Sequence, residues 1–158
     1  MQHQDMGDLL ETLKTMGELE LSVAQFYQTC GELWPEHHEF WTDMKYAEMK
    51  HADNVARMAR ILEERPENFQ TGRFIVPTTV KMFIADIQSK IERLKSQEVD
   101  EKKGLSLGLG FEQSYLESKY AEIVRTDDHE FKSLVREINA DTVFHREYLS
   151  GKLREWVS

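Results

Sequence analysis

Five side chains that could hold metal ions stand inside stripes of otherwise apolar residues. Glu20 occupies the middle of the first stripe, and Glu48 and His51 are neighbours in the second. Glu112 and His145 stand in two later stripes of the same kind. Burying an unpaired carboxylate costs several kcal/mol, so these polar residues need a shared partner inside the protein. Carboxylate oxygens with one imidazole in each half suit iron or manganese, with zinc possible.

The spacing of the first two stripes is helical, because steps of three and four residues alternate throughout. The first stripe consists of Leu9, Leu13, Met16, Glu20, Val23, Tyr27, Cys30 and Trp34. The second consists of Trp41, Met44, Glu48, His51, Val55, Met58 and Leu62. Glu48 and His51 therefore project from one helix face and can bind one ion together. A buried salt-bridge cluster, the alternative, would need a Lys or Arg, and neither stripe contains one.

The two halves of the chain repeat one pattern. In each half, a helix with a central Glu is followed about 30 residues later by a helix with a central His, which indicates a duplicated helix hairpin. The repeat is imperfect, because Thr142 stands three residues before His145, where the first half has Glu48 before its histidine. Asp141 lies next to Thr142, and a small rotation of the helix would bring this carboxylate in as a replacement.

Long helices must position these residues. Proline, glycine and the apolar periodicity predict helices over about 5–34, 36–65, 78–97, 101–125 and 129–156. The stretch between Pro66 and Pro77 is too mixed to be helical. Short turns predict two antiparallel hairpins, and the longer connection between them predicts a crossover. We therefore expect one all-α domain over 1–158, a four-helix bundle of two hairpins joined by a long crossover that contains an extra helix.

Composition excludes several classes of protein. The chain has 158 residues, enough for one domain, and its 8 Gly and 3 Pro are too few for a β-sandwich or barrel. A net charge of −9 argues against nucleic-acid binding. A single cysteine, Cys30, excludes an internal disulfide framework and is expected to be a small core residue. The chain shows neither a signal peptide nor an apolar run that could span a membrane, so we expect a cytoplasmic protein.

Four stretches cover all of the predicted bundle helices. They are ELELSVAQFY (18–27), FWTDMKYAEMKHADNVARM (40–58), LSLGLGFEQSYLESKYAEIV (105–124) and FHREYL (144–149). These stretches resemble the ferritin-like di-iron carboxylate proteins, and within them the rubrerythrin family. That superfamily binds metal through one Glu from each of two helices and a Glu-x-x-His from each of the other two. The resemblance implies five metal ligands in this chain: Glu20, Glu48, His51, Glu112 and His145.

The same resemblance implies two iron ions, bridged by carboxylates with histidines as terminal ligands, and an oxidoreductase that acts on peroxide or dioxygen. The cysteine-rich rubredoxin module is absent, so electrons would come from a separate donor protein. Tyr27 lies on the same face as Glu20 and is either a hydrogen-bond donor to a ligand carboxylate or an ordinary core residue. Tyr115 stands three residues after Glu112, where some rubrerythrins carry an extra carboxylate.

Thr142 leaves a second interpretation open. With no carboxylate at this position, the protein could be a non-catalytic ferritin-like metal-binding or scaffold protein with a degenerate second half-site. Iron storage in a cage and hydroxylation of an organic substrate are further alternatives. If two ions bind, we expect lower occupancy of the one nearest His145. A homodimer is the expected oligomer, because the long crossover and the apolar faces offer interface surface.

Overall fold

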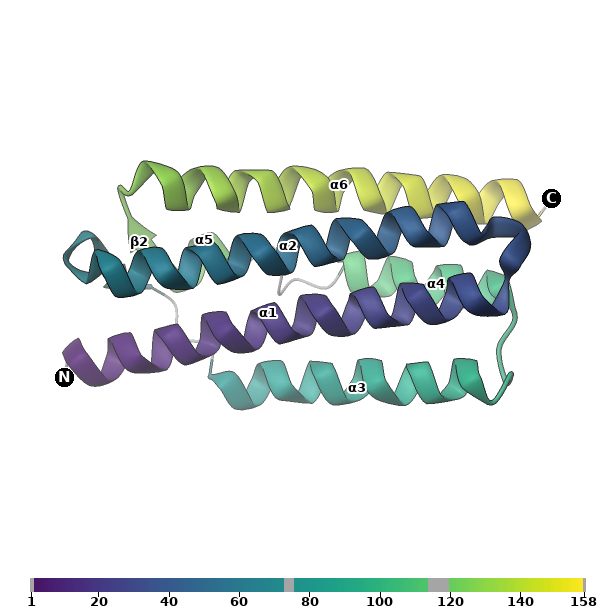
Figure 1. Cartoon of the computed structure of the whole chain (residues 1–158), viewed down its shortest axis with the longest axis horizontal. Coiled ribbons are helices and arrows are strands. Elements are labelled where there is room, and N and C mark those ends of the chain that lie inside the picture. Colours follow the sequence, from purple (N-terminus) through teal and green to yellow (C-terminus); the bar gives the residue numbers. More distant parts are fainter. Residues whose placement is uncertain (1, 73–75, 114–119, 158) are drawn as a thin grey trace.

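The computed structural model describes residues 2–72, 76–113 and 120–157, and most of them are helical (Figure 1). The helices are α1 (Gln2–Leu33), α2 (His38–Glu64), α3 (Pro77–Lys95), α4 (Glu101–Gln113), α5 (Tyr120–Ile123) and α6 (His129–Val157). Single 3₁₀ turns cover Pro35–His37 and Pro66–Asn68, and two short strands are β1 (Phe69–Thr71) and β2 (Val124–Thr126). The all-α class predicted from the sequence is confirmed.

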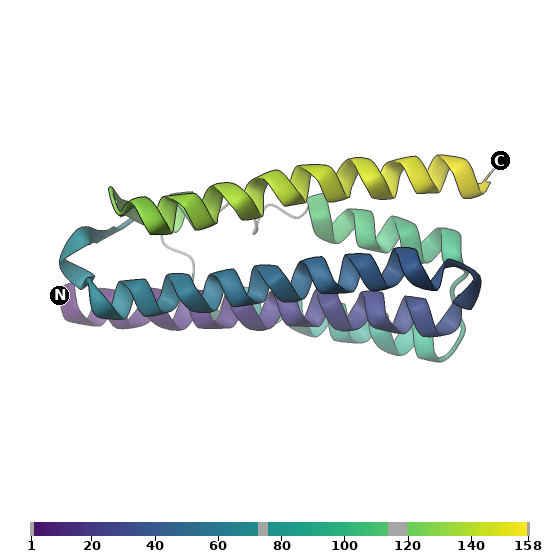
Figure 2. The same cartoon turned by 45° about the horizontal axis from the view of Figure 1, so that its top comes forward.

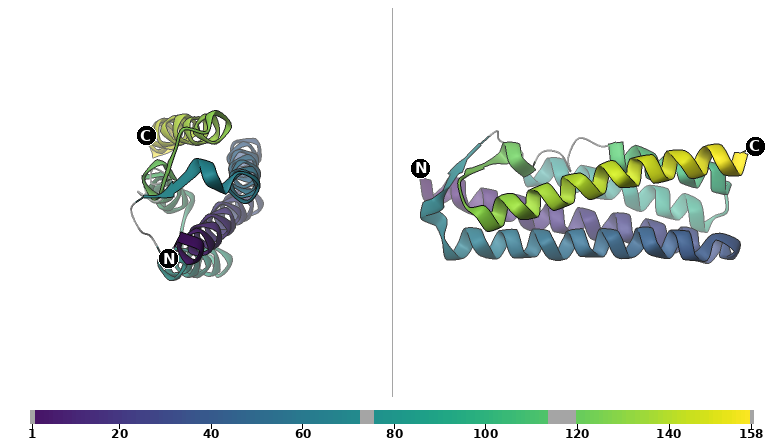
Figure 3. Two further views of the ribbon diagram at one scale, coloured as in Figure 1. Left: turned by 90° about the vertical axis from the view of Figure 1, so that its left-hand side faces the viewer. Right: turned by 90° about the horizontal axis from the view of Figure 1, so that it is seen from above.

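Four helices form a ring of neighbours around the interior. α1 contacts α2, α2 contacts α6, α6 contacts α4, and α4 closes the ring against α1 (Figures 2 and 3). α2 and α4 run opposite to α1 and α6 (Figure 1). α3 lies outside this ring, packed along α1, and it carries the chain from α2 to α4. Side chains at mid-length on four different helices therefore point into one interior.

Proline and capping side chains set the helix ends. Pro35 and Pro66 follow the ends of α1 and α2, because proline cannot continue a helical hydrogen-bond ladder. Pro77 begins α3 at a position where a missing N–H costs nothing. The Oδ1 atom of Asp128 accepts a 3.0 Å hydrogen bond from the backbone N–H of Phe131 at the start of α6. These signals explain why most predicted bounds lie within a few residues of the observed ones.

The prediction of one helix over 101–125 is wrong at its C-terminal end. Residues 124–126 form β2, which pairs antiparallel with β1 in the register Phe69↔Thr126, Gln70↔Arg125 and Thr71↔Val124. β-Branched residues such as Val124 suit such a pair, and Phe69 in β1 and Val124 in β2 are both buried. The stretch after Pro66, predicted to be irregular, therefore contains a short strand. Residues 114–119, which fall inside the predicted helix, lie outside the described residues.

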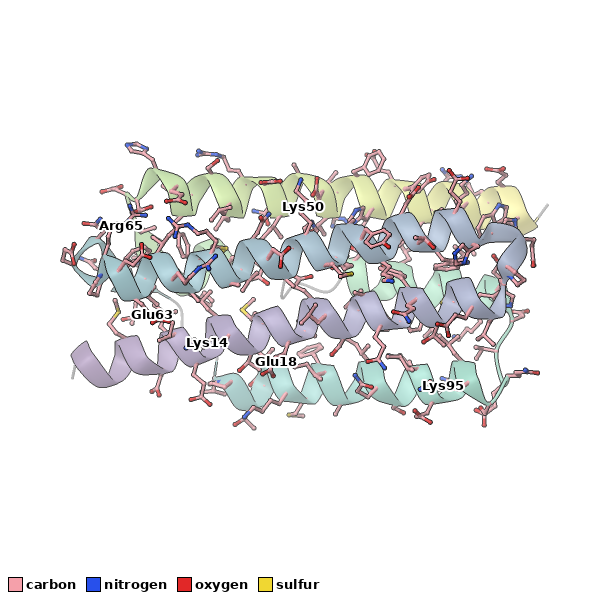
Figure 4. All side chains as sticks on the ribbon, in the orientation of Figure 1. Lys14, Glu18, Lys50, Glu63, Arg65 and Lys95 are labelled. Carbon is pink, nitrogen blue, oxygen red and sulfur yellow. The ribbon has the colours of Figure 1, made fainter. Side chains whose placement is uncertain are left out.

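The apolar stripes of the sequence form the core. Leu13, Met16, Met58 and Cys30 are fully buried, and burial of a large apolar side chain stabilises the fold by about 1.5–3 kcal/mol. Charged side chains cover the outside, as Lys14 and Glu63 show where they form a 3.5 Å ion pair across α1 and α2 (Figure 4). The polar members of the stripes are thus enclosed by apolar packing.

None of the described helices combines the length and the apolar character that crossing a membrane would require.

Candidate metal centre

The structure brings all five predicted ligands together in the interior. The exposed fraction of these side chains is 0% for Glu20, Glu48 and His51, 1% for Glu112 and 4% for His145. They come from α1, α2, α4 and α6, so each helix of the ring contributes. Their ligand atoms fall into two clusters of three, in each of which all atoms lie within 4.8 Å of one another.

The first cluster consists of Glu20, Glu48 and His51. The Nδ1 atom of His51 lies 3.6 Å from Oε2 of Glu48 and 3.9 Å from Oε2 of Glu20. These distances are too long for hydrogen bonds, which end near ~3.2 Å for nitrogen and oxygen. Two ligands that are each about 2.1 Å from one tetrahedral ion lie about 3.4 Å apart. The first cluster therefore has the spacing of ligands around a cation.

The second cluster consists of Glu48, Glu112 and His145. The Nδ1 atom of His145 lies 3.6 Å from Oε1 of Glu48 and 3.7 Å from Oε2 of Glu112. Glu48 belongs to both clusters, and its two oxygens face different histidines. Shared use of one carboxylate is the geometry of a ligand that bridges two ions.

Two tyrosines donate hydrogen bonds to Glu20 and Glu112, the two carboxylates that each belong to one cluster only and are called the terminal carboxylates below. The Tyr27 hydroxyl donates a 2.7 Å hydrogen bond to Oε1 of Glu112, which decides between the two roles considered for Tyr27 from the sequence. The Tyr120 hydroxyl donates a 2.9 Å hydrogen bond to Oε1 of Glu20. Each bond joins one half of the chain to the other. In both cases the second oxygen, Oε2, is the one that belongs to a cluster.

Asp141 does not replace the carboxylate that is missing at Thr142 but lies behind His51. Its Oδ2 atom lies 3.1 Å from Nε2 of His51, the ring nitrogen opposite the cluster. A carboxylate in this position keeps the proton on Nε2 and directs the Nδ1 lone pair inward, as carboxylates behind metal-binding histidines do. The hydroxyl of Thr142, meanwhile, donates to the backbone carbonyl of Ile138 at 2.9 Å. Neither residue adds a carboxylate to the clusters.

The electrostatics of the interior favour a cation. Burial lowers the pKa of His145, but the carboxylates of Glu112 and Glu48 outweigh it and raise that pKa to about 10. Burial raises the pKa of Glu112, yet His145, Glu48 and Tyr27 bring it below its usual value. Both shifts mean that positive charge beside these carboxylates is stabilised. The Nδ1 atoms of His51 and His145 make no hydrogen bond within the described residues.

A third group of two glutamates and one histidine differs from the interior clusters, because its histidine is hydrogen-bonded to one of its glutamates. Glu36, His37 and Glu101 lie near the turn between α1 and α2, and Glu36 is exposed. The Nδ1 atom of His37 is 2.6 Å from Oε1 of Glu101, a direct hydrogen bond, and the indole N–H of Trp41 donates to the same oxygen at 3.3 Å. These groups satisfy one another, so this arrangement is a structural contact.

Sequence reasoning missed two of the supporting residues. Tyr120 stands eight residues after Glu112, whereas Tyr27 stands seven after Glu20, so the repeat does not align them. The sequence suggests Asp141 only as a replacement ligand, although an acidic residue one helical turn from a central histidine is also suited to hold the histidine of another helix. The position of Tyr115 lies outside the described residues.

Cys30, expected to be a small core residue, is fully buried. Burial, with the nearby charge of Glu101, raises the pKa of its thiol well above the usual value. The thiolate is therefore disfavoured, and Cys30 is a packing residue.

A scan of protein-family models, a search of curated proteins and a search of solved structures each gave no match to this chain.

Proposed function

We propose that this chain is a ferritin-like four-helix bundle that binds two metal ions, iron in the first place with manganese or zinc as alternatives. We further propose that it is a rubrerythrin-like oxidoreductase that reduces peroxide or dioxygen. The observation that carries the proposal is the position of Glu48. Its two oxygens lie 3.6 Å from Nδ1 of His51 and 3.6 Å from Nδ1 of His145, so one carboxylate serves two clusters.

The donor set fits such ions. Each cluster offers two carboxylates and one imidazole, a combination suited to iron, manganese and zinc. Three protein ligands also leave at least one coordination position open for water or substrate, which is typical of catalytic sites. A purely structural site would use its fourth position for another side chain.

The chain's own residues prepare this site. Tyr27 and Tyr120 each fix one oxygen of a terminal carboxylate, and Asp141 fixes the ring of His51. Apolar packing keeps bulk water away from the centre. When bound, the metal pair would supply two electrons, with which one peroxide molecule and two protons form two waters. The electrons would come from a separate donor protein, because one cysteine cannot hold a four-sulfur site.

A non-catalytic metal-binding or scaffold role is the second candidate. The observation in its favour is that the Thr142 side chain hydrogen-bonds its own helix and adds no ligand. With only Glu48 between the two clusters, coupling between two ions would be weaker than with two bridging carboxylates. This candidate predicts metal binding without fast turnover.

Oxidation of bound ferrous iron separates these candidates. The protein would be loaded without oxygen and mixed in a stopped-flow instrument with hydrogen peroxide or with dioxygen. We expect faster oxidation by peroxide than by dioxygen, and both faster than for free ferrous iron. Glu48→Ala should bind little iron, whereas Glu63→Ala, a change at an exposed position of the same helix, should behave as wild type.

Rates equal to those of free ferrous iron in a protein that still binds the metal would support the scaffold role instead. Equal metal content in Glu48→Ala and Glu63→Ala would contradict both roles for this site.

A further inference from the structure

Aromatic side chains form a continuous path from the candidate metal centre toward one end of the helices. The path begins at Tyr27, whose hydroxyl is 2.7 Å from Oε1 of Glu112. The Tyr27 ring stacks on Trp41, with centroids 6.0 Å apart and ring planes inclined by 30°. Trp41 in turn lies 6.0 Å from Trp34 and 6.4 Å from Trp156, again between ring centroids.

Exposure to solvent increases along this path. Tyr27 and Trp41 are fully buried. Trp34, at the end of α1, and Trp156, near the end of α6, are only half-buried. Trp156 stacks on the ring of His37 at a centroid distance of 3.7 Å, and Nζ of Lys152 lies 5.8 Å from its ring centroid. The path therefore leads from the buried interior to the surface.

The chemistry of the members is what distinguishes this path from ordinary aromatic packing. Phenol and indole are, with thiols and thioethers, the side chains that lose an electron most readily, whereas the phenyl ring of neighbouring Phe40 does not. Electron tunnelling falls steeply with distance, so several steps between rings in contact are faster than one long step. Every step here joins a hydrogen-bonded pair or two rings whose centroids lie 6.0–6.4 Å apart, within the range of packed aromatic pairs.

From this arrangement we infer that Tyr27, Trp41 and the two half-buried tryptophans form a relay that carries oxidising equivalents from the metal centre to the protein surface. The relay acts when hydrogen peroxide is present and the donor protein is not. The inference rests on the proposed function, because peroxide reduction at the centre is the source of the oxidising equivalents.

The relay can be written as a balanced sequence. With peroxide at the centre as the oxidant, Tyr27 would give up one electron and pass its phenolic proton to Glu112 across their hydrogen bond. Trp41 gives an electron to Tyr27, which recovers its proton, and Trp34 or Trp156 then gives an electron to Trp41. After two such transfers, the surface tryptophan takes one oxygen atom from water and releases two protons, giving hydroxytryptophan. In sum, one tryptophan and one hydrogen peroxide give one hydroxytryptophan and one water.

Peptide mass spectrometry tests this inference by measuring where oxygen is added. Iron-loaded protein would be treated with peroxide without a donor, and zinc-loaded protein, which cannot change oxidation state, would measure direct oxidation by peroxide. We expect oxidation of Trp34 and Trp156 to be at least fivefold higher in the iron-loaded protein. Trp41→Phe should remove this excess. Trp41→Tyr, whose ring has nearly the size of phenylalanine but can be oxidised, should recover it.

The exposed Tyr46, which lies on α2 outside these contacts, provides the control, and Tyr46→Phe should keep the wild-type excess. Equal excess in Trp41→Phe and wild type, with equal iron content, would overturn the relay and leave the proposed function standing. No bound iron in wild type would instead overturn the proposed function itself.

Freeze-quench electron paramagnetic resonance tests the relay in the unchanged protein. We expect a tryptophan or tyrosine radical within the first turnover of iron-loaded protein with peroxide. Peroxide consumption by bound iron without any organic radical would contradict the relay, whatever the stability of the Trp41 variants.

Discussion

The two clusters of the candidate centre have the same donors but different support. Each has two carboxylates and one Nδ1, and each shares Glu48. Behind His51, however, Asp141 lies 3.1 Å from Nε2, and within the described residues no side chain plays this role for His145. The residue that corresponds to Asp141 in the first half of the repeat is Ala47, which has no donor or acceptor in its side chain.

The absence of a carboxylate at Thr142 has a different consequence from the one expected from the sequence. From the sequence, the missing carboxylate is expected to weaken the ion nearest His145. In the sequence repeat, Thr142 corresponds to Glu48, whose carboxylate belongs to both clusters. Under the proposed function, the absence of a carboxylate at Thr142 would therefore leave both ions without a second bridge. Lower metal occupancy of the cluster that contains His145 stays a prediction. We attribute it to the absence of a carboxylate behind that histidine.

Among the changes that separate the two clusters, removing a terminal carboxylate should have the largest effect. We expect Glu20→Gln to lose mainly the ion next to His51 and Glu112→Gln mainly the ion next to His145, each by about a hundredfold in affinity or more. Metal analysis after anaerobic loading would check this, and we expect each variant to retain one metal ion per chain. Loss of both ions in both variants would mean that the clusters bind as one unit.

Asp141→Asn should weaken the ion next to His51 by about 10–100-fold, because a neutral amide holds the imidazole less firmly. The reciprocal change, Ala47→Asp, should strengthen the ion next to His145 by supplying the missing support. Calorimetric titration with manganese would resolve the two affinities. If Asp141→Asn changed both affinities equally, the difference in support would not be what distinguishes the clusters.

Thr142→Glu should tighten both ions by about tenfold, since carboxylate number and charge set the affinity for hard cations. Without metal, the same change should destabilise the fold, because a further carboxylate is buried. Thermal unfolding with and without manganese would show a larger metal-dependent rise in Tm than in wild type. A gain confined to the ion next to His145 would restore the interpretation made from the sequence.

The smallest effect concerns an exposed carboxylate, which contrasts with the buried ones. Hydrogen bonds from Arg57 and Arg65 lower the pKa of Glu130 from 4.5 to about 2. The stabilisation from a lowered carboxyl pKa is present above the unfolded value and is lost as pH falls through the folded value. Glu130→Gln should therefore lower Tm slightly at pH 7, by less than about 4 °C. The difference should shrink below about pH 4.5 and vanish near pH 2, while metal content stays as in wild type.

Much of the fold and all five candidate ligands could be predicted from the sequence, because both depend on the helical period. A Glu or His in an apolar stripe must be buried wherever the helix packs, so Glu20, Glu48 and His145 are apparent from spacing alone. Proline positions likewise located the ends of α1 and α2.

Features that depend on contacts between distant segments could not be predicted in the same way. β1 and β2 form where residues 69–71 and 124–126 meet across the fold, and each is too short to show a strand period. The contact of Asp141 with His51 joins α6 to α2, and the bond from Tyr120 to Glu20 joins α5 to α1. No spacing within one helix reveals such pairs.

Anomalous diffraction from crystals grown with manganese would test the central claim, that Glu48 serves two metal ions, most directly. The account predicts two anomalous peaks on opposite sides of the Glu48 carboxylate, one beside Nδ1 of His51 and the other beside Nδ1 of His145. The peak beside His51 should be at least as strong as the other. A single peak on one side of Glu48, or peaks only at the group formed by His37 and Glu101, would contradict it.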